Sequence, residues 1–188
     1  MNKELIIRSS SNNIDFALLK DSKLVEFQKD NENIKLSVGD IFFAKVRKTM
    51  PALNAAFVNV GYKKDGFLHY HDLGPKLPTL MKFIKSVSSG KLKNVSLKNF
   101  PSEQDIEKNG LISDILKPNQ NVLVQVVKEP ISTKGPRISS EISLAGRYLV
   151  LVPFSNRISI SQKIENDEEK ERLKRLVKSI APKGFGVI

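Results

Sequence analysis

Apolar and polar residues alternate with a period of two over much of the chain, and this pattern predicts short β-strands. The clearest run is residues 55–60, which offers one apolar and one mixed face. Its two faces are Ala56, Val58 and Val60, and Ala55, Phe57 and Asn59. The face that carries the valines is the natural core side, so Phe57 is expected to point outward beside a polar neighbour.

The next predicted strand, which begins after a turn at residues 61–66, can extend this outer face. It can place Phe67 and His69 on the same side as Phe57, with Lys63 and Lys64 in the turn. Flat rings and cations are what a single-stranded nucleic acid needs for base stacking and phosphate contacts. The alternative is that both phenylalanines close a hydrophobic core.

The first 37 residues predict a β-meander. The expected features are strands at Lys3–Arg8, Ile14–Lys20 and Lys23–Gln28, a tight hairpin turn at Asp21-Ser22 and a polar connection at Ser9–Asn13. Three short strands cannot form a core on their own.

Residues 38–127 predict a five-stranded OB barrel, so the fold class is mainly β with some helix (α+β). The first strand, Ile41–Lys48, places Phe43, Lys45 and Arg47 on one face. After the two strands described above come a long insertion, a short helix or turn near Ile112–Leu116, and a strand at Asn121–Lys128.

Residues 128–188 predict a small α+β segment. A loop rich in proline and glycine precedes strands at 138–142 and 147–153 and a helix from Asn166 to Ala181. Asn166 can cap this helix, acidic residues suit its first turn, and Pro182 ends it. Its apolar stripe is Leu173, Leu176, Val177 and Ile180. Val187-Ile188 predicts the start of a further strand, so we expect the chain to be a piece of a longer protein.

Composition points to a polyanionic partner. Lys and Arg number 31 against 20 Asp and Glu, which gives a net charge of +11 and a pI near 9.8. Apolar runs are too short to span a bilayer and the polar start has no signal-peptide core, so the prediction is a cytoplasmic protein. The absence of cysteine excludes disulfides, thiolate nucleophiles and cysteine-based zinc sites.

The positive charge is densest in the insertion at residues 73–102, which contains six lysines and no acidic residue. These lysines are Lys76, Lys82, Lys85, Lys91, Lys93 and Lys98. We interpret this stretch as a phosphate-contacting insertion that is partly packed or helical. A solvated surface loop is the alternative.

Four blocks resemble the N-terminal region of the ribonuclease E/G family of bacterial endoribonucleases. They are Met50–Gly61, Gly66–Leu68, Lys134-Gly135 and Ile142–Pro153. The resemblance implies a partial RNase H-like subdomain at 1–37, an OB-fold RNA-binding domain at 38–127, and part of the sensor for a 5′-monophosphate at 128–188. The chain is more similar to the ribonuclease G type than to the longer ribonuclease E type.

Functional residues carry over individually from this resemblance. Phe57 and Phe67 match the stacking aromatics of the family, and Lys134 matches a basic residue that contacts RNA. Gly146 and Val150 match positions that line the 5′-phosphate pocket, where a missing side chain lets the RNA end approach the backbone. Gln162-Lys163 stands where the family often has two arginines, and the arginine and threonine that grip the phosphate would follow Ile188. With them absent, this sequence is expected to show little preference for a monophosphate.

Catalysis is expected elsewhere in the parent protein. The resemblance implies two aspartates that hold magnesium for phosphodiester hydrolysis, and both would lie beyond Ile188. No motif within this sequence replaces them, so we predict no catalytic residue and no cofactor here. His69 is expected to be a surface ring on the RNA face, and His71 a turn residue.

The resulting hypothesis is an RNA-binding and 5′-end-sensing portion of a single-strand-specific endoribonuclease of RNA processing and decay. Its partner is single-stranded RNA and not a membrane, and the resemblance allows a homo-oligomeric parent. The residues predicted to bind RNA are Phe57, Phe67, Lys134, Lys45, Arg47, Lys63, Lys64 and His69. The alternatives are a stand-alone OB-fold protein associated with ribosomes or translation, and an independent enzyme.

Overall fold

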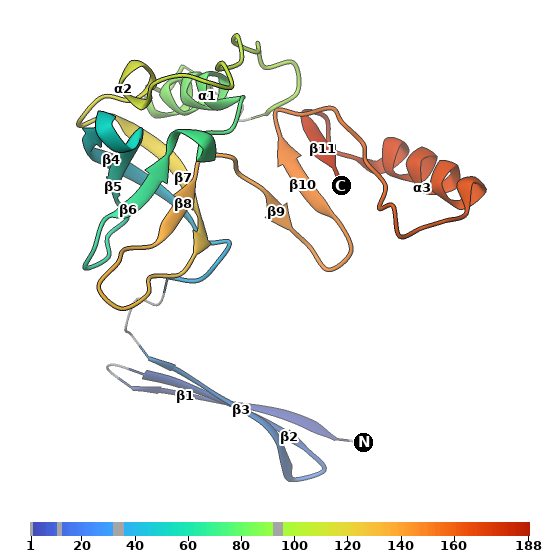
Figure 1. Ribbon diagram of the computed structural model, residues 1–188. Helices are drawn as coiled ribbons and strands as arrows, with labels where there is room; N and C mark the ends of the chain where they lie inside the picture. The colour runs from blue at the N-terminus through green and yellow to red at the C-terminus, as the bar shows by residue number, and fades with distance from the viewer. Residues whose placement is uncertain (1, 11–12, 32–35, 92–95) are drawn as a thin grey trace. The chain divides into compact units, whose positions relative to one another are not determined.

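The computed structural model describes residues 2–10, 13–31, 36–91 and 96–188 (Figure 1). The chain divides into two compact units, residues 1–35 and residues 36–188.

The first unit is an antiparallel meander in the order β1-β2-β3. Its strands are β1 (Lys3–Ser10), β2 (Asn13–Lys20) and β3 (Lys23–Asn31). Asp21 and Ser22 both have positive φ, 49° and 64°, which is the conformation of a tight two-residue hairpin. The predicted strands and turn are therefore confirmed, while residues 11 and 12 of the predicted polar connection lie outside the described residues.

The second unit is built around a closed barrel whose five strands follow the order β4-β5-β6-β8-β7. The strands are β4 (Ile41–Met50), β5 (Ala55–Asn59), β6 (Gly66–His69), β7 (Asn121–Lys128) and β8 (Arg137–Ser139). All neighbours pair antiparallel except β6 and β8, which run parallel. The structure confirms a mainly β chain with a five-stranded barrel, as expected for an OB fold. The fifth strand, β8, lies after residue 127.

The barrel interior is filled by the apolar side chains that the alternating pattern selects. Val46, Val58, Leu68, Val124 and Ile138 are all fully buried. This confirms that the valine face of β5 points inward.

Ala55 shares the outer face of β5 with Phe57, but it is fully buried. It begins β5 directly after Asn54, which ties that end of the barrel together. The Asn54 carbonyl accepts a hydrogen bond from the Tyr70 N–H (2.9 Å), and its side chain bonds the backbone of Gly110 and Ile112. The surrounding turns therefore cover Ala55.

Helical segments lie across one end of the barrel (Figure 1). They are the helix α1 (Leu77–Ser88), the short helix α2 (Ile112–Ile115) and the 3-10 turns η1 (Pro51–Leu53) and η2 (Tyr70–Asp72). The predicted helix or turn near residue 112 is confirmed, and the insertion is helical in its first part. His71 lies in the η2 turn, as predicted.

A second sheet follows the barrel, with strands in the order β11-β10-β9. Its elements are β9 (Leu144–Ala145), β10 (Val150–Pro153), the helix α3 (Asp167–Ile180) and β11 (Phe185–Val187). The predicted helix is confirmed, since the Asn166 side chain accepts a hydrogen bond from the Glu169 N–H (3.0 Å) as its N-cap. The further strand predicted at Val187 is confirmed as β11.

Two predicted strands have different bounds. The strand expected at 147–153 is wrong at its start, because residues 146–149 form the turn of the β9–β10 hairpin, closed by a 2.8 Å bond from the Gly146 N–H to the Leu149 carbonyl. The strand expected at 138–142 is shorter, because β8 ends at Ser139. Alternation alone does not reveal where a chain leaves one sheet for another.

An aromatic cluster joins the second sheet to the insertion. Phe83 of α1 lies edge-on to Phe100 and Phe154, with ring centroids 5.2 and 5.5 Å away. Phe154 directly follows β10, so this cluster connects β10 to the helix at the end of the barrel.

Candidate nucleic-acid interface

A row of outward side chains crosses four adjacent strands of the barrel at one level. Lys48 of β4 lies opposite Phe57 of β5, Phe57 opposite Phe67 of β6, and Phe67 opposite Arg137 of β8. We call Lys48, Phe57, Phe67 and Arg137 the platform. Two aromatic rings lie in the middle of the platform, and a cation lies at each end.

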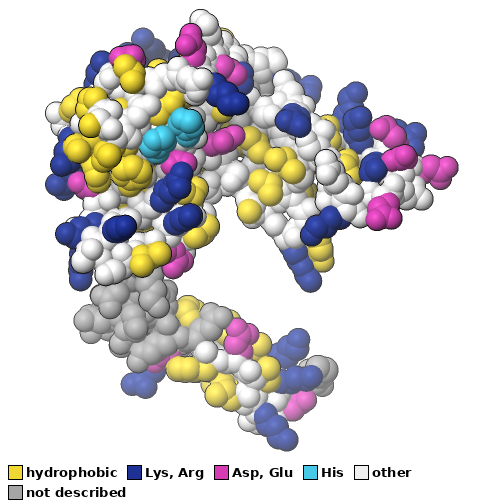
Figure 2. Space-filling view, in the orientation of Figure 1, with side chains coloured by type: hydrophobic (Ala, Val, Ile, Leu, Met, Phe, Trp, Pro, Cys, Tyr) yellow, Lys and Arg dark blue, Asp and Glu magenta, His cyan; other side chains and the backbone are white. Residues whose placement is uncertain are grey.

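The two rings of the platform lie edge-on to each other, with an interplanar angle of 70°. The centroids of Phe57 and Phe67 are 5.8 Å apart, and His69 lies 6.5 Å beyond Phe67 with its ring nearly parallel. The Lys48 ammonium lies 5.2 Å from the centre of the Phe57 ring, within range of a cation–π contact. Figure 2 shows the two histidines, in cyan, beside exposed hydrophobic side chains and near Lys and Arg side chains.

Phe57 and Phe67 do not close the core, which was the alternative for these rings. Both are half-buried and neither belongs to the cluster that fills the barrel. They border instead a groove of about 570 Å³ that is open to the surface. Its other lining residues are Lys48, Lys64, Asp65, Thr133, Lys134, Gly135 and Arg137.

The loop before β8 brings Lys134 to this groove. It packs against the β5–β6 turn so tightly that a Cβ on Gly135 would lie 2.0 Å from the Asp65 carbonyl oxygen. Lys134 and Lys64 are both exposed and line the same groove, and Lys63 is exposed beside Lys64. Residues about 70 apart in sequence thus place cations around the two rings.

The charges of Arg47 and Arg137 are partly balanced by ion pairs. Arg47 lies 3.2 Å from an oxygen of Asp65, and Arg137 donates two hydrogen bonds of 2.9 Å to Asp72. The bonds to Asp72 raise the pKa of the Arg137 guanidinium, which therefore stays charged. Because the Arg137 side chain is still 45% exposed, its remaining donors can reach a phosphate.

Sequence reasoning placed Lys45 and Arg47 on the outer face of β4 but missed Lys48 and Arg137. A bulge between Val46 and Lys48 shifts the register, so that Lys48 and not Arg47 lies opposite Phe57. Lys45 lies opposite Asn59, farther along the same outer face. No local sequence pattern predicts the bulge. Arg137 could have been found, because it begins the strand that follows the loop rich in proline and glycine.

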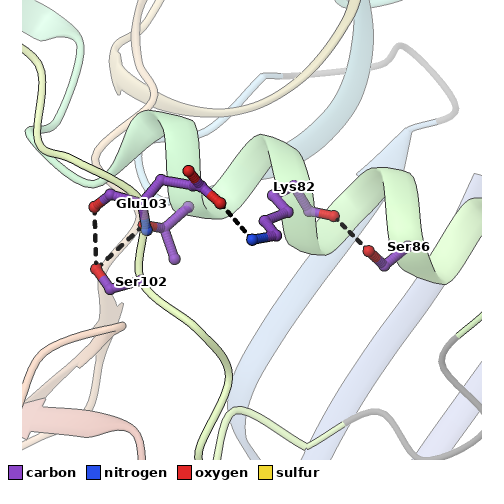
Figure 3. Close-up of polar contacts among 5 residues, drawn as sticks. Lys82, Ser86, Ser102 and Glu103 are labelled. Atoms are coloured by element: carbon purple, nitrogen blue, oxygen red, sulfur yellow. Dashed lines mark hydrogen bonds and ion pairs between the residues drawn. The ribbon is translucent and has the colours of Figure 1, made fainter.

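In the folded chain, acidic residues from outside the insertion balance part of its positive charge. Acidic residues from just beyond it fold back along α1, where Lys76 donates to Asp105 (2.6 Å) and Lys82 pairs with Glu103 (Figure 3). Glu103 is further fixed by a 2.9 Å hydrogen bond from its N–H to the Thr79 hydroxyl. Lys93 lies outside the described residues.

Gly146 and Val150 lie on the β9–β10 hairpin, away from the platform in sequence and in a different sheet. Gly146 is exposed, and Val150 is half-buried and held by a 2.8 Å bond from its N–H to the Ile188 carbonyl. A Cβ on Gly146 would meet the Leu149 carbonyl oxygen at 3.2 Å. Gln162 is exposed before α3.

Comparison with known proteins shows which proteins this chain is similar to. The model of the ribonuclease E/G family matches residues 143–188. Ribonuclease G of Escherichia coli (strain K12) and that of Salmonella typhimurium (strain SL1344) are each 30% identical to this chain over all 188 residues. The chain belongs to the ribonuclease E/G family. Ribonuclease E of Synechocystis sp. is 38% identical over 152 residues, which are 80% of the chain.

The match covers only part of each relative. The chain spans 35% of the ribonuclease G relatives and 18% of the Synechocystis ribonuclease E. The ribonuclease G relatives align along the entire chain, in keeping with the expected likeness to that type of the family. The names of these relatives do not favour a stand-alone OB-fold protein.

No helix among the described residues has the length and apolar character needed to cross a bilayer. Within the same residues, no three His, Asp or Glu side chains gather as a candidate metal site.

Proposed function

We propose that this chain is the RNA-binding and 5′-end-sensing portion of a single-strand-specific endoribonuclease that acts in RNA processing and decay. The observation that supports RNA binding is the platform, in which Phe57 and Phe67 lie side by side between Lys48 and Arg137. The family relationship supports an RNA substrate for the parent protein. In that protein, magnesium-dependent hydrolysis would belong to other residues.

The chemistry of the platform suits an unpaired strand. Bases that are not paired can stack on Phe57 and Phe67, which line the groove, and stacking on aromatic rings tolerates any base. Phosphates of the same strand would meet Lys64 and Lys134 along the groove. A duplex keeps its bases stacked on each other, so it can use the cations but not the rings.

This difference predicts a preference that can be measured directly. We expect single-stranded RNA to bind more tightly than a duplex of the same sequence, by at least roughly fivefold if only one base stacks at 1–3 kcal/mol. Fluorescence anisotropy with a labelled strand, alone and annealed to its complement, gives both dissociation constants. Equal affinity for the two forms would contradict stacking and leave only non-specific phosphate binding.

We infer that the β9–β10 hairpin forms one wall of the 5′-phosphate pocket. Gly146 supports this role, because its exposed backbone lets a terminal phosphate approach more closely than any side chain would permit. Val150, which the resemblance assigns to the same pocket, begins the opposite strand of the hairpin and pairs with Ala145.

The test uses a form of the protein that carries the family's Arg-Thr pair after Ile188. We expect it to prefer 5′-monophosphorylated RNA to 5′-hydroxyl RNA, because a phosphate gains from charged, bidentate hydrogen bonds. Gly146→Phe should abolish this preference and leave the affinity for 5′-hydroxyl RNA, the internal control, unchanged. A preference that survives Gly146→Phe would place the pocket elsewhere.

A further inference from the structure

A second groove lies between β4 and α1. It has a volume of about 740 Å³, and its lining includes Phe43, Met81, Lys82, Lys85 and Asn121. Phe43 is 56% exposed, although it is one of the largest apolar side chains of the barrel. A single exposed ring is ordinary on a protein surface. This ring, however, lines a groove together with lysine and amide side chains, which are groups that can bind a ligand.

The charges of this groove favour an anionic ligand. Lys82 is neutralised by Glu103, which also lines the groove (Figure 3). Lys85 on α1 and Lys45 on β4 form no ion pair with any residue that the structure describes. Lys85 lines the groove, and Lys45 lies next to it, opposite Asn121 on the neighbouring strand, so positive charge remains beside the aromatic ring.

The outer face of β4 runs from the groove to the platform, since Phe43 lines the groove and Lys48 belongs to the platform. Phe43 and Lys45 alternate outward on this strand, and the bulge then turns Lys48 to the same side. Lys45 lies between Asn121 of β7 and Asn59 of β5. The six residues from Phe43 to Lys48 span about 17 Å at the usual rise of a strand, which is room for a few more nucleotides.

We propose that the β4–α1 groove binds a further stretch of the single-stranded RNA that lies on the platform. Phe43 stacks on a base of this stretch, and Lys45 and Lys85 contact its phosphates. The exposed amide of Asn121 can hydrogen-bond a base edge. This inference rests on the proposed RNA binding by the platform, and it extends the site size of the barrel.

The test depends on the length of the RNA. We compare an oligonucleotide of about 4 nucleotides with one of about 12, both within the range of site sizes of OB folds. Phe43→Ala and Phe43→Leu should each weaken the longer RNA about fivefold or more and leave the shorter one unchanged, because loss of one stacked base has an effect of that size. Phe43→Tyr retains a ring and should bind both lengths like the wild type.

Controls separate this inference from the proposed function. Leu111→Ala removes an exposed apolar side chain outside both grooves and should change neither affinity. If Phe57→Ala weakens both RNA lengths while Phe43→Ala and Phe43→Leu weaken neither, the platform stands and the groove does not bind RNA. If Phe57→Ala binds both lengths like the wild type, the proposed function fails and the inference with it. Thermal unfolding of each variant shows that the fold is retained.

Discussion

Alanine at Phe57 or Phe67 is expected to weaken the binding of single-stranded RNA by roughly 1–3 kcal/mol for each ring, or about fivefold to 150-fold in Kd. The reason is that each ring offers a face for one base, and a methyl group offers none. Since the rings are adjacent, with centroids 5.8 Å apart, the effects of the two substitutions on the binding free energy are not expected to add in the double variant. Fluorescence anisotropy with one labelled RNA measures all three variants.

The fold of these variants should be retained, because neither ring contributes to the buried core of the barrel. Circular dichroism and the urea midpoint test this for each protein. Phe27→Ala is the matched control: Phe27 is an equally apolar ring, 58% exposed on β3, and its loss should not change the affinity. A Phe57→Ala protein that unfolds would show that the ring closes the core after all.

Glutamine at Lys48, Lys64 and Lys134 together is expected to flatten the salt dependence of RNA binding. A single strand gives a slope of about −0.7 in log K against log salt for each phosphate contact, so three lost contacts reduce the slope by about 2. Over a fourfold rise in salt, this corresponds to a difference of roughly 18-fold in affinity between the wild type and the variant. Anisotropy titrations at several salt concentrations give both slopes.

A variant with the same change in net charge separates local contacts from the general positive field. Replacing Lys170, Lys174 and Lys178 of α3 with glutamine removes three charges from a different part of the chain. At ordinary salt the field of such distant charges is largely screened, so this variant should keep a slope close to that of the wild type. Equal flattening by both triple variants would mean that RNA binds the chain through its overall charge.

Local patterns were sufficient where an element interacts mainly with itself or with the core. The strand at 121–128 was predicted with the bounds that β7 has, because its valines alternate and a turn precedes it. The cap at Asn166 was predicted for a similar reason, since a helix start depends on residues within one turn. Phe57 was expected to face outward, and it borders the groove.

The remaining features depend on partners far along the chain. Arg137 reaches the platform only because β8 pairs in parallel with β6, and its ion pair joins residues 65 positions apart. The positive charge of Lys82 is balanced by Glu103, which lies 21 residues later and just outside the stretch that looked free of acids. Composition of a segment therefore overstates its charge whenever a neighbouring segment folds back on it.

The position of β8 has a consequence for how the barrel is made. Its strands β4, β5, β6 and β7 are all complete by Lys128, yet the sheet closes only when Arg137–Ser139 inserts between β6 and β7. During synthesis on the ribosome, the nascent chain must therefore hold two unpaired strand edges until these last residues emerge from the exit tunnel. Unpaired edges are where chains aggregate, and contacts across such long separations form slowly. The shortest stretch of this gene that can yield a folded barrel thus has to include the codon for Ser139.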